Sequence, residues 1–141
     1  MSALNPFTGS SSLPDHLQRG QYGKNLARRF LQRRGLKYLT RNYASVRREI
    51  ELLFRECQTL VFVEVRTRTG EQWQPPAASV DRAKKRRLTH AAEDYLQELE
   101  VVSYHRFDIV EVILKRNQTL VTIRHIAGVF VSEILSPQGN L

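Results

Sequence analysis

The chain has 141 residues, of which 41% are hydrophobic and 26% are charged, as in a single globular domain. Its 22 Lys and Arg against 14 Asp and Glu give a net charge of +8 and a pI near 10.1, which fits polyanionic partners such as nucleic acid as well as a merely solubilising surface. No apolar run reaches the roughly 20 residues of a membrane span, and a single cysteine excludes an intramolecular disulfide and a cysteine-based zinc site, so we expect no membrane partner and a reduced, cytoplasmic setting.

The N-terminal segment is predicted to precede the folded domain. Residues 1–18 are rich in Ser, Pro and Gly without periodicity, which indicates a disordered tail. The start lacks a basic segment followed by an apolar one, so no secretory signal is expected. From Arg19 or Gly20 to Arg34, apolar residues recur on one helical face, and Gly35 is typical of the position after a helix end.

Three strands are expected after this helix, over about residues 36–43, 49–54 and 61–68. The gap between the second and third, residues 56–59, is short enough for a hairpin, so these two strands are predicted to be adjacent and antiparallel. Residues 69–79 contain paired prolines, which exclude a helix and a central strand and indicate a loop.

A second helix is expected over residues 80–99, with Ser79 as its N-cap, and two further strands over residues 104–114 and 119–125. The order of helix, three strands, helix and two strands predicts an α/β sandwich, in which two main helices flank a small mixed five-stranded sheet. The predicted organisation is an N-terminal tail over residues 1–18, one domain over residues 19–134 and a C-terminal tail over residues 135–141.

The most informative stretch is residues 47–68, where acidic residues stand in strand-like runs. Because successive side chains alternate across a strand, Glu51 on one strand and Glu64 and Arg66 on the next are expected to converge on one face. Two carboxylates and a cation are the components of a metal-dependent site that cleaves phosphodiesters. The alternative is a pair of solvated acids that pair with Arg66 and Arg68 across the strands.

A second candidate surface is the first half of the second predicted helix, which carries the basic run Lys84, Lys85, Arg86 and Arg87. The run covers several directions around a helix, so a solvated face and a phosphate-contacting patch have equal support. In the preceding loop, Trp73 either stacks on an unpaired base, which is worth roughly 1–3 kcal/mol, or packs onto the domain edge.

The remaining reactive side chain types receive no catalytic role. Cys57 lies in the predicted hairpin loop without a histidine nearby in sequence, which indicates an ordinary thiol. His90, His105 and His125 lack the spacing of metal ligands. Asp108, in the segment RFDIV, is expected to belong to a buried strand.

Several segments together resemble a known family. GQYGKNLARRFLQRRGLKYLTRNY, REIELLF, LVFVEVRTR, AASVDRAKKRRLTHAAEDYL and RFDIV are similar in order and spacing to the YraN-like proteins of bacteria. That group is related to Holliday junction resolvases and to the restriction-endonuclease-like superfamily. The likeness extends over roughly residues 20 to 130 and implies a restriction-endonuclease-like fold.

In that superfamily, a helix Glu, a strand Asp and a Glu-x-Lys tripeptide bind Mg²⁺ and align water for attack on phosphate. The resemblance places these positions on Lys24, on Glu51 and on the tripeptide from Glu64 to Arg66. Only Glu64 keeps the residue type without change, and Glu49 belongs to the motif without being a principal ligand. A cation at Lys24 removes a ligand and repels a divalent ion, so Mg²⁺ binding is expected to be weak or absent.

These features predict a nucleic-acid-binding protein, with DNA as the expected partner, whose nuclease-type site is degenerate. Lys24, Arg68 and residues 84–87 would contact phosphates largely without sequence preference. One alternative is a Mg²⁺-dependent, structure-selective DNA endonuclease, in which two glutamates hold the metal and an arginine stabilises the phosphate charge. Its catalytic residues would be Glu51, Glu64 and Arg66, with Glu51 and Glu64 as metal ligands. The other is a protein-interaction module with an acidic partner, and the oligomeric state stays open.

Overall fold

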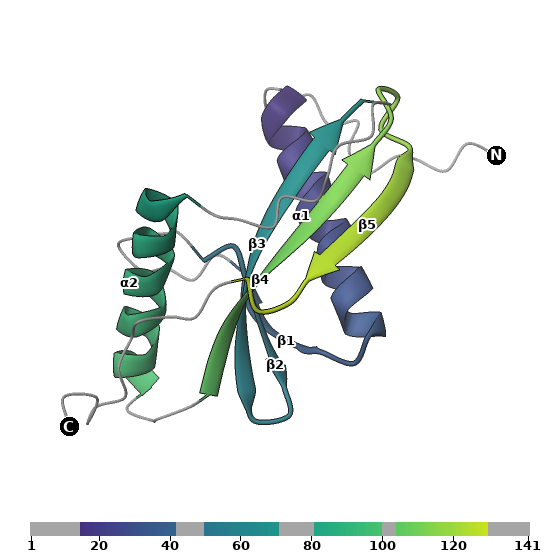
Figure 1. The fold of residues 1–141 in the computed structure, drawn as a ribbon. Coiled ribbons are helices and arrows are strands. Elements are labelled where there is room, and N and C mark those ends of the chain that lie inside the picture. Colours follow the sequence, from purple (N-terminus) through teal and green to yellow (C-terminus); the bar gives the residue numbers. More distant parts are fainter. Residues whose placement is uncertain (1–14, 42–49, 71–80, 100–103, 130–141) are drawn as a thin grey trace.

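The computed structural model describes residues 15–41, 50–70, 81–99 and 104–129, which form an α/β fold (Figure 1). Its elements are α1 (Asp15–Arg33), β1 (Lys37–Arg41), β2 (Leu52–Glu56), β3 (Thr59–Thr69), α2 (Arg82–Leu99), β4 (Tyr104–Leu114) and β5 (Leu120–Ile126). This order and the five-stranded mixed sheet confirm the architecture expected from the sequence. Neither described helix is long and apolar enough to cross a membrane.

The strands lie in the order β1-β2-β3-β4-β5, so neighbours in the sheet are also neighbours in the chain. Only β3 and β4 run parallel, and all other pairs are antiparallel. A parallel pair needs a long crossover, and α2 lies in the connection between β3 and β4. The expected hairpin between β2 and β3 turns at Cys57 and Gln58, with Glu56 paired to Thr59.

The two helices cover opposite faces of the sheet (Figure 1). On one face, Ala27 and Leu31 of α1 pack with alternate residues of β3, namely Val61, Val63 and Val65. On the other face, α2 packs over the first halves of β3 and β4 through Leu88, Ala91, Ala92, Phe62 and Phe107. The second half of β3 on the α2 side therefore carries residues that are not covered by this apolar cluster, and these include Glu64.

Most elements differ by one or more residues from the bounds expected from the sequence, and the starts of α1, β2 and α2 are three examples. Helix α1 begins at Asp15, inside the segment that was expected to be a disordered tail. Strand β2 begins at Leu52, so Glu51 precedes the strand. Helix α2 begins at Arg82, because the carboxylate of Asp81 caps it: Oδ1 accepts a hydrogen bond of 2.8 Å from the backbone N–H of Lys84.

Several expectations fall on residues outside the described ranges. These are the tail over residues 1–14, Glu49, the loop with Trp73, the proposed N-cap Ser79, and the chain after residue 129.

Helix α1 approaches β3 most closely at Gly23, one residue before Lys24. A Cβ atom built on Gly23 would lie 1.9 Å from Oγ1 of Thr67 and 3.1 Å from its Cβ. We expect Gly23→Ala to lower the free energy of unfolding by about 1–3 kcal/mol, since α1 must move away from the sheet. Urea unfolding measures this change.

The matched control is Gly20→Ala, in the same helix. A Cβ on Gly20 meets no atom within 4 Å, so the better helix propensity of Ala should stabilise the protein by up to about 1 kcal/mol. Equal effects of the two substitutions would show that the close contact at Gly23 is not rigid.

Candidate functional site

Glu51 bridges the edge of β3 and helix α1. Strand β2 starts at Leu52, which pairs with Val63, so β2 supplies no partner strand alongside Val65. The carboxylate of Glu51 takes that place, because its Oε2 accepts a hydrogen bond of 2.7 Å from the backbone N–H of Val65. Its Oε1 lies 3.8 Å from Nζ of Lys24 on α1. The side chain is held at the sheet edge by a backbone hydrogen bond and an ion pair.

Glu64 lies on β3 and faces the side of the sheet on which α2 packs. It follows Phe62 by two residues, and Phe62 belongs to the apolar cluster under α2. Only 14% of the Glu64 side chain is exposed, and its Oε2 is buried without a hydrogen bond. The group that compensates this oxygen is the ammonium of Lys84, whose Nζ lies 3.5 Å away.

The electrostatics show that the groups at this point of the sheet are neighbours. Burial raises the pKa of Glu64 above its ordinary value, and the negative charge of Glu51 raises it further. The cations of Lys84 and Arg66 act in the opposite direction but do not cancel the rise. Glu51 and Arg66 therefore lie close enough to Glu64 to shift its pKa, although Glu51 precedes β2 and does not lie on the strand that was expected for it.

The position of Lys84 follows from the start of α2. The Asp81 cap makes Lys84 the third residue of the helix. Lys84 precedes Leu88 by four residues and Ala91 by seven, and both of these are buried against the sheet. Residues at this spacing share a helix face, so Lys84 must project towards β3.

The basic run of α2 is therefore divided between two environments. Lys84 and Lys85 are half-buried, whereas Arg86 and Arg87 are exposed. The predicted basic surface of this run is therefore restricted to its exposed residues, Arg86 and Arg87. The contact between Lys84 and Glu64 was not predicted, although the spacing to Leu88 and Ala91 carried the signal.

Arg68 forms an ion pair with an acid of β4. Its Nε lies 3.4 Å from Oε2 of Glu111 on β4. Glu111 is only 1% exposed and was missed in the sequence. A single acid inside the apolar run IVEVIL was the signal that marks it.

A second polar group lies on the opposite face of the sheet. Asp108 is buried, as expected, and accepts hydrogen bonds from Nε of Arg106 at 3.0 Å and from the backbone N–H of Gly128 at 2.9 Å. Its Oδ2 lies 2.7 Å from Nε2 of His125, which sequence reasoning had left without a role. Arg106 also donates to Glu56 over 2.7 Å. We assign this network to stability.

The pKa of Asp108 shows that the network holds a charge in the interior. Burial alone raises the pKa of a carboxyl group, but hydrogen bonds from His125, Arg106 and the N–H of Gly128 outweigh it and hold the pKa below its usual value. The buried carboxylate therefore stays ionised in the folded protein.

The residues at the Glu51–Glu64 site do not fit a tightly held Mg²⁺ ion. Mg²⁺ needs several oxygen ligands in octahedral geometry. Here the two carboxylates each face a lysine ammonium, at 3.8 Å and 3.5 Å, and one oxygen of Glu51 accepts the N–H of Val65. Among the described residues, no group of three His, Cys, Asp or Glu side chains could hold a metal ion.

The charge state of Glu64 gives a testable pH dependence of stability. Its pKa is raised in the fold above the ordinary 4.5, so between these two values the folded protein binds more protons than the unfolded chain. The free energy of unfolding should therefore fall as pH rises through the window above 4.5. Glu64→Gln should remove this part of the fall, as measured by urea unfolding from pH 4 to pH 8.

Glu98→Gln is the control for this experiment, because Glu98 is an exposed acid on α2. It should leave the pH profile of the wild type unchanged. If Glu64→Gln and Glu98→Gln give the same profile, the carboxyl group of Glu64 is not the source of the slope.

Comparison with known proteins agrees with the motif resemblance. A family model described as "Uncharacterised protein family UPF0102" matches residues 23–112. A UPF0102 protein of Ralstonia pickettii (strain 12J) is 45% identical over 117 residues, which cover 79% of this chain and 87% of that protein. Similar proteins occur in Pelotomaculum thermopropionicum, with 35% identity over 79% of this chain and 93% of that protein, and in Janthinobacterium sp. (strain Marseille), with 42% identity over 64% and 74%.

Proposed function

This chain belongs to the uncharacterised protein family UPF0102, the YraN-like proteins, and we propose that it binds nucleic acid, with DNA as the preferred partner, at a nuclease-type site that does not cleave. The observation that carries the proposal is the pairing of each site carboxylate with a lysine. Lys24 faces Glu51 and Lys84 faces Glu64, where a nuclease would hold its metal ion. The two ammonium groups neutralise the carboxylates that would otherwise repel a phosphate, without the Lewis acidity that cleavage needs.

The surrounding charge supports phosphate binding. The chain carries a net charge of +8, and Arg86 and Arg87 are exposed on the helix that delivers Lys84. Arg66 lies close enough to Glu64 to lower its pKa, and a guanidinium group binds phosphate oxygens through two parallel hydrogen bonds. Contacts of this type bind the backbone and carry little sequence information, so we propose binding that is largely independent of sequence.

The salt dependence of DNA binding tests the proposal. Replacing Lys85, Arg86 and Arg87 together by Gln should weaken binding to a labelled duplex and reduce the slope of log K against log[salt] by up to about 2.7, at roughly 0.9 for each lost phosphate contact. Fluorescence anisotropy at four salt concentrations gives both quantities.

The matched control replaces Arg29, Arg33 and Arg34 by Gln; these arginines are exposed in the last turns of α1 and directly after its end. This variant loses the same charge away from α2 and should bind with nearly the wild-type slope. Equal losses in the two variants would mean that DNA senses only net charge. No binding by the wild type at any salt concentration would refute the proposal and favour an acidic protein partner.

One observation favours the endonuclease as second candidate. The buried Oε2 of Glu64 accepts no hydrogen bond, and a second carboxylate, that of Glu51, is near enough to raise the pKa of Glu64. Incubation with branched and single-stranded DNA in Mg²⁺ or Mn²⁺ distinguishes the candidates. Cleavage that disappears in Glu64→Ala would establish the nuclease, whereas we expect none.

We place this binding in the cytoplasm. The support is the single cysteine of the chain, which forms no intramolecular disulfide, together with the presence of nucleic acid in that compartment. Fractionation of cells that express the protein should recover it with nucleic acid, and nuclease treatment should release it.

A further inference from the structure

A row of charged side chains continues the site across the sheet. In the register of the strands, Arg66 on β3 lies beside Glu111 on β4, and Glu111 lies beside Arg124 on β5. Side chains at paired positions leave a sheet on the same side, so these three share the face that carries Glu64. Arg68, two residues beyond Arg66, projects from the same face and lies 3.4 Å from Glu111 through its Nε.

Among the described elements, α2 packs on this face of the sheet but away from the row of charged side chains. It therefore leaves the row open to a partner. Helix α2 packs over the first halves of β3 and β4, through contacts with Leu53, Phe62 and Phe107. The second halves of β3 and β4, together with β5, extend beyond α2 (Figure 1). Arg66, Arg68 and Arg124 are all half-buried, so their side chains are ordered by the protein while part of each surface reaches solvent.

The buried carboxylate of Glu111 is a reason for the arginines beside it, but its single negative charge is smaller than their total positive charge. A carboxylate that is 1% exposed must be paired, and one guanidinium group suffices to neutralise it. Arg66 and Arg124 lie beside Glu111 in the register and Arg68 contacts it, so the row combines three positive charges with one negative charge. A carboxylate beneath a set of guanidinium groups also fixes their direction, which reduces the entropy lost when they bind an anion.

We propose that the nucleic-acid surface runs from the Glu51–Glu64 site across β4 onto β5, with Arg66, Arg68 and Arg124 as one phosphate-binding row anchored on Glu111. This inference rests on the proposed function and adds β5, and Arg124 in particular, to the surface. The partner is the phosphate backbone of a nucleic acid, because guanidinium groups on β3 and β5, on the two sides of Glu111 on β4, complement a chain of regularly spaced anions.

The test is Arg124→Gln in the DNA-binding assay across a salt series. We expect binding to weaken roughly fivefold near physiological salt, and the salt slope to fall by about 0.9, as for one lost phosphate contact. Arg124→Lys retains the charge and should keep most of the slope. Thermal unfolding of both variants shows directly whether weaker binding comes from a lost contact or from a damaged fold.

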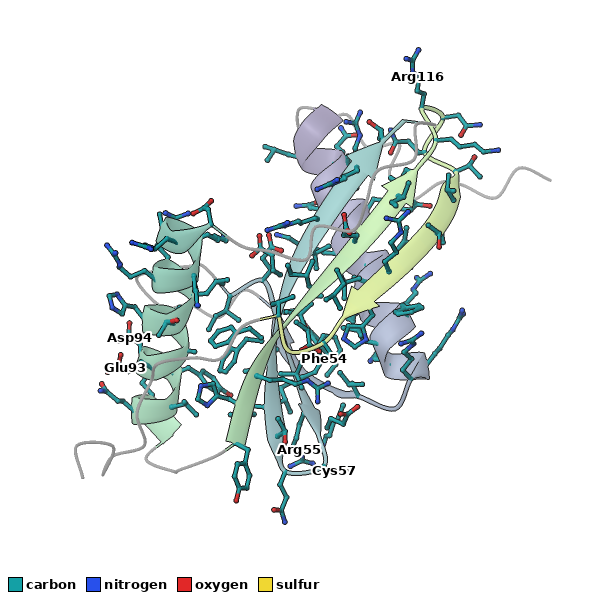
Figure 2. All side chains as sticks on the ribbon, in the orientation of Figure 1. Phe54, Arg55, Cys57, Glu93, Asp94 and Arg116 are labelled. Carbon is teal, nitrogen blue, oxygen red and sulfur yellow. The ribbon has the colours of Figure 1, made fainter. Side chains whose placement is uncertain are left out.

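Arg55→Gln is the matched control. Arg55 is exposed on β2 beside the hairpin of Cys57, at the end of the molecule opposite the Arg116 turn (Figure 2). It should bind as the wild type does. If Arg124→Gln and Arg55→Gln behave alike while the wild type binds DNA, the extension onto β5 is wrong and the proposed function stands. If the wild type does not bind DNA, both are wrong.

Discussion

Asp108→Asn should lower the free energy of unfolding by about 3–5 kcal/mol, the range for removing one partner of a buried ion pair. Asp108 accepts hydrogen bonds from Arg106 and Gly128 and contacts His125 at 2.7 Å. The amide of Asn presents one acceptor oxygen and an NH₂ group to these donors. In this variant the guanidinium group of Arg106 would lose the negative charge of Asp108, with which it is paired in the wild type.

The pH dependence of this effect has a definite sign. The pKa of Asp108 is depressed in the fold below its ordinary 3.8, so its contribution is fully present above pH 3.8 and is lost as pH falls through the folded value. The difference between wild type and Asp108→Asn should therefore be constant at neutral pH and shrink in acid. Urea unfolding at a series of pH values measures it.

Glu98→Gln provides the control, since it removes one negative charge from the exposed part of α2. Its effect should stay within about 0.5 kcal/mol. A loss of less than 1 kcal/mol in Asp108→Asn would show that the network around Asp108 contributes little to stability.

Lys24→Glu should create a metal site beside Glu51 and Glu64. The side chain at this position faces Glu51, whose Oε1 lies 3.8 Å from Nζ of Lys24. Glutamate there would remove the competing ammonium group and bring a third carboxylate to Glu51 and Glu64. Without metal, repulsion among these carboxylates should destabilise the variant at neutral pH.

Divalent metal should reverse that loss, because a ligand that binds only the folded state stabilises it by about 2.7 kcal/mol at one hundred times its Kd. Thermal unfolding with and without Mn²⁺ measures this, and calorimetric titration gives the Kd. Lys24→Gln removes the ammonium group without adding a ligand and should respond much less. Equal stabilisation of the wild type by Mn²⁺ would mean that Lys24 does not block the site.

The elements that could be predicted from the sequence are those whose residue types and spacing indicate one structure without knowledge of distant contacts. The strand over residues 104–114 has the bounds that were expected, since its run of β-branched and aromatic residues has no competing interpretation. The hairpin at Cys57 was also expected from the short gap between two apolar runs. Strand β2 was predicted to begin too early, because the alternation of Glu51 with apolar neighbours resembles a strand, although the carboxylate of Glu51 replaces a strand partner.

The site residues could be predicted only as far as their partners are local or belong to a motif. The likeness to a nuclease motif groups Glu51, Glu64 and Lys24; in the structure Lys24 contacts Glu51, and Glu51 raises the pKa of Glu64. The contact of Lys84 with Glu64 depends on how α2 docks on the sheet, which the two residues themselves do not encode. The same holds for the pairing of Asp108 with His125, since these residues meet only after β4 and β5 pair.

We propose that lysine ammonium groups stand in place of a metal ion at Glu51 and Glu64, so that nucleic acid binds without a divalent cation and is not cut. The most direct measurement compares the Kd for labelled DNA in EDTA and in Mg²⁺ at equal ionic strength, with the DNA recovered afterwards and analysed for breaks. We expect the same Kd in both buffers and intact DNA. Binding that requires Mg²⁺, or breaks that depend on Glu64, would refute this proposal.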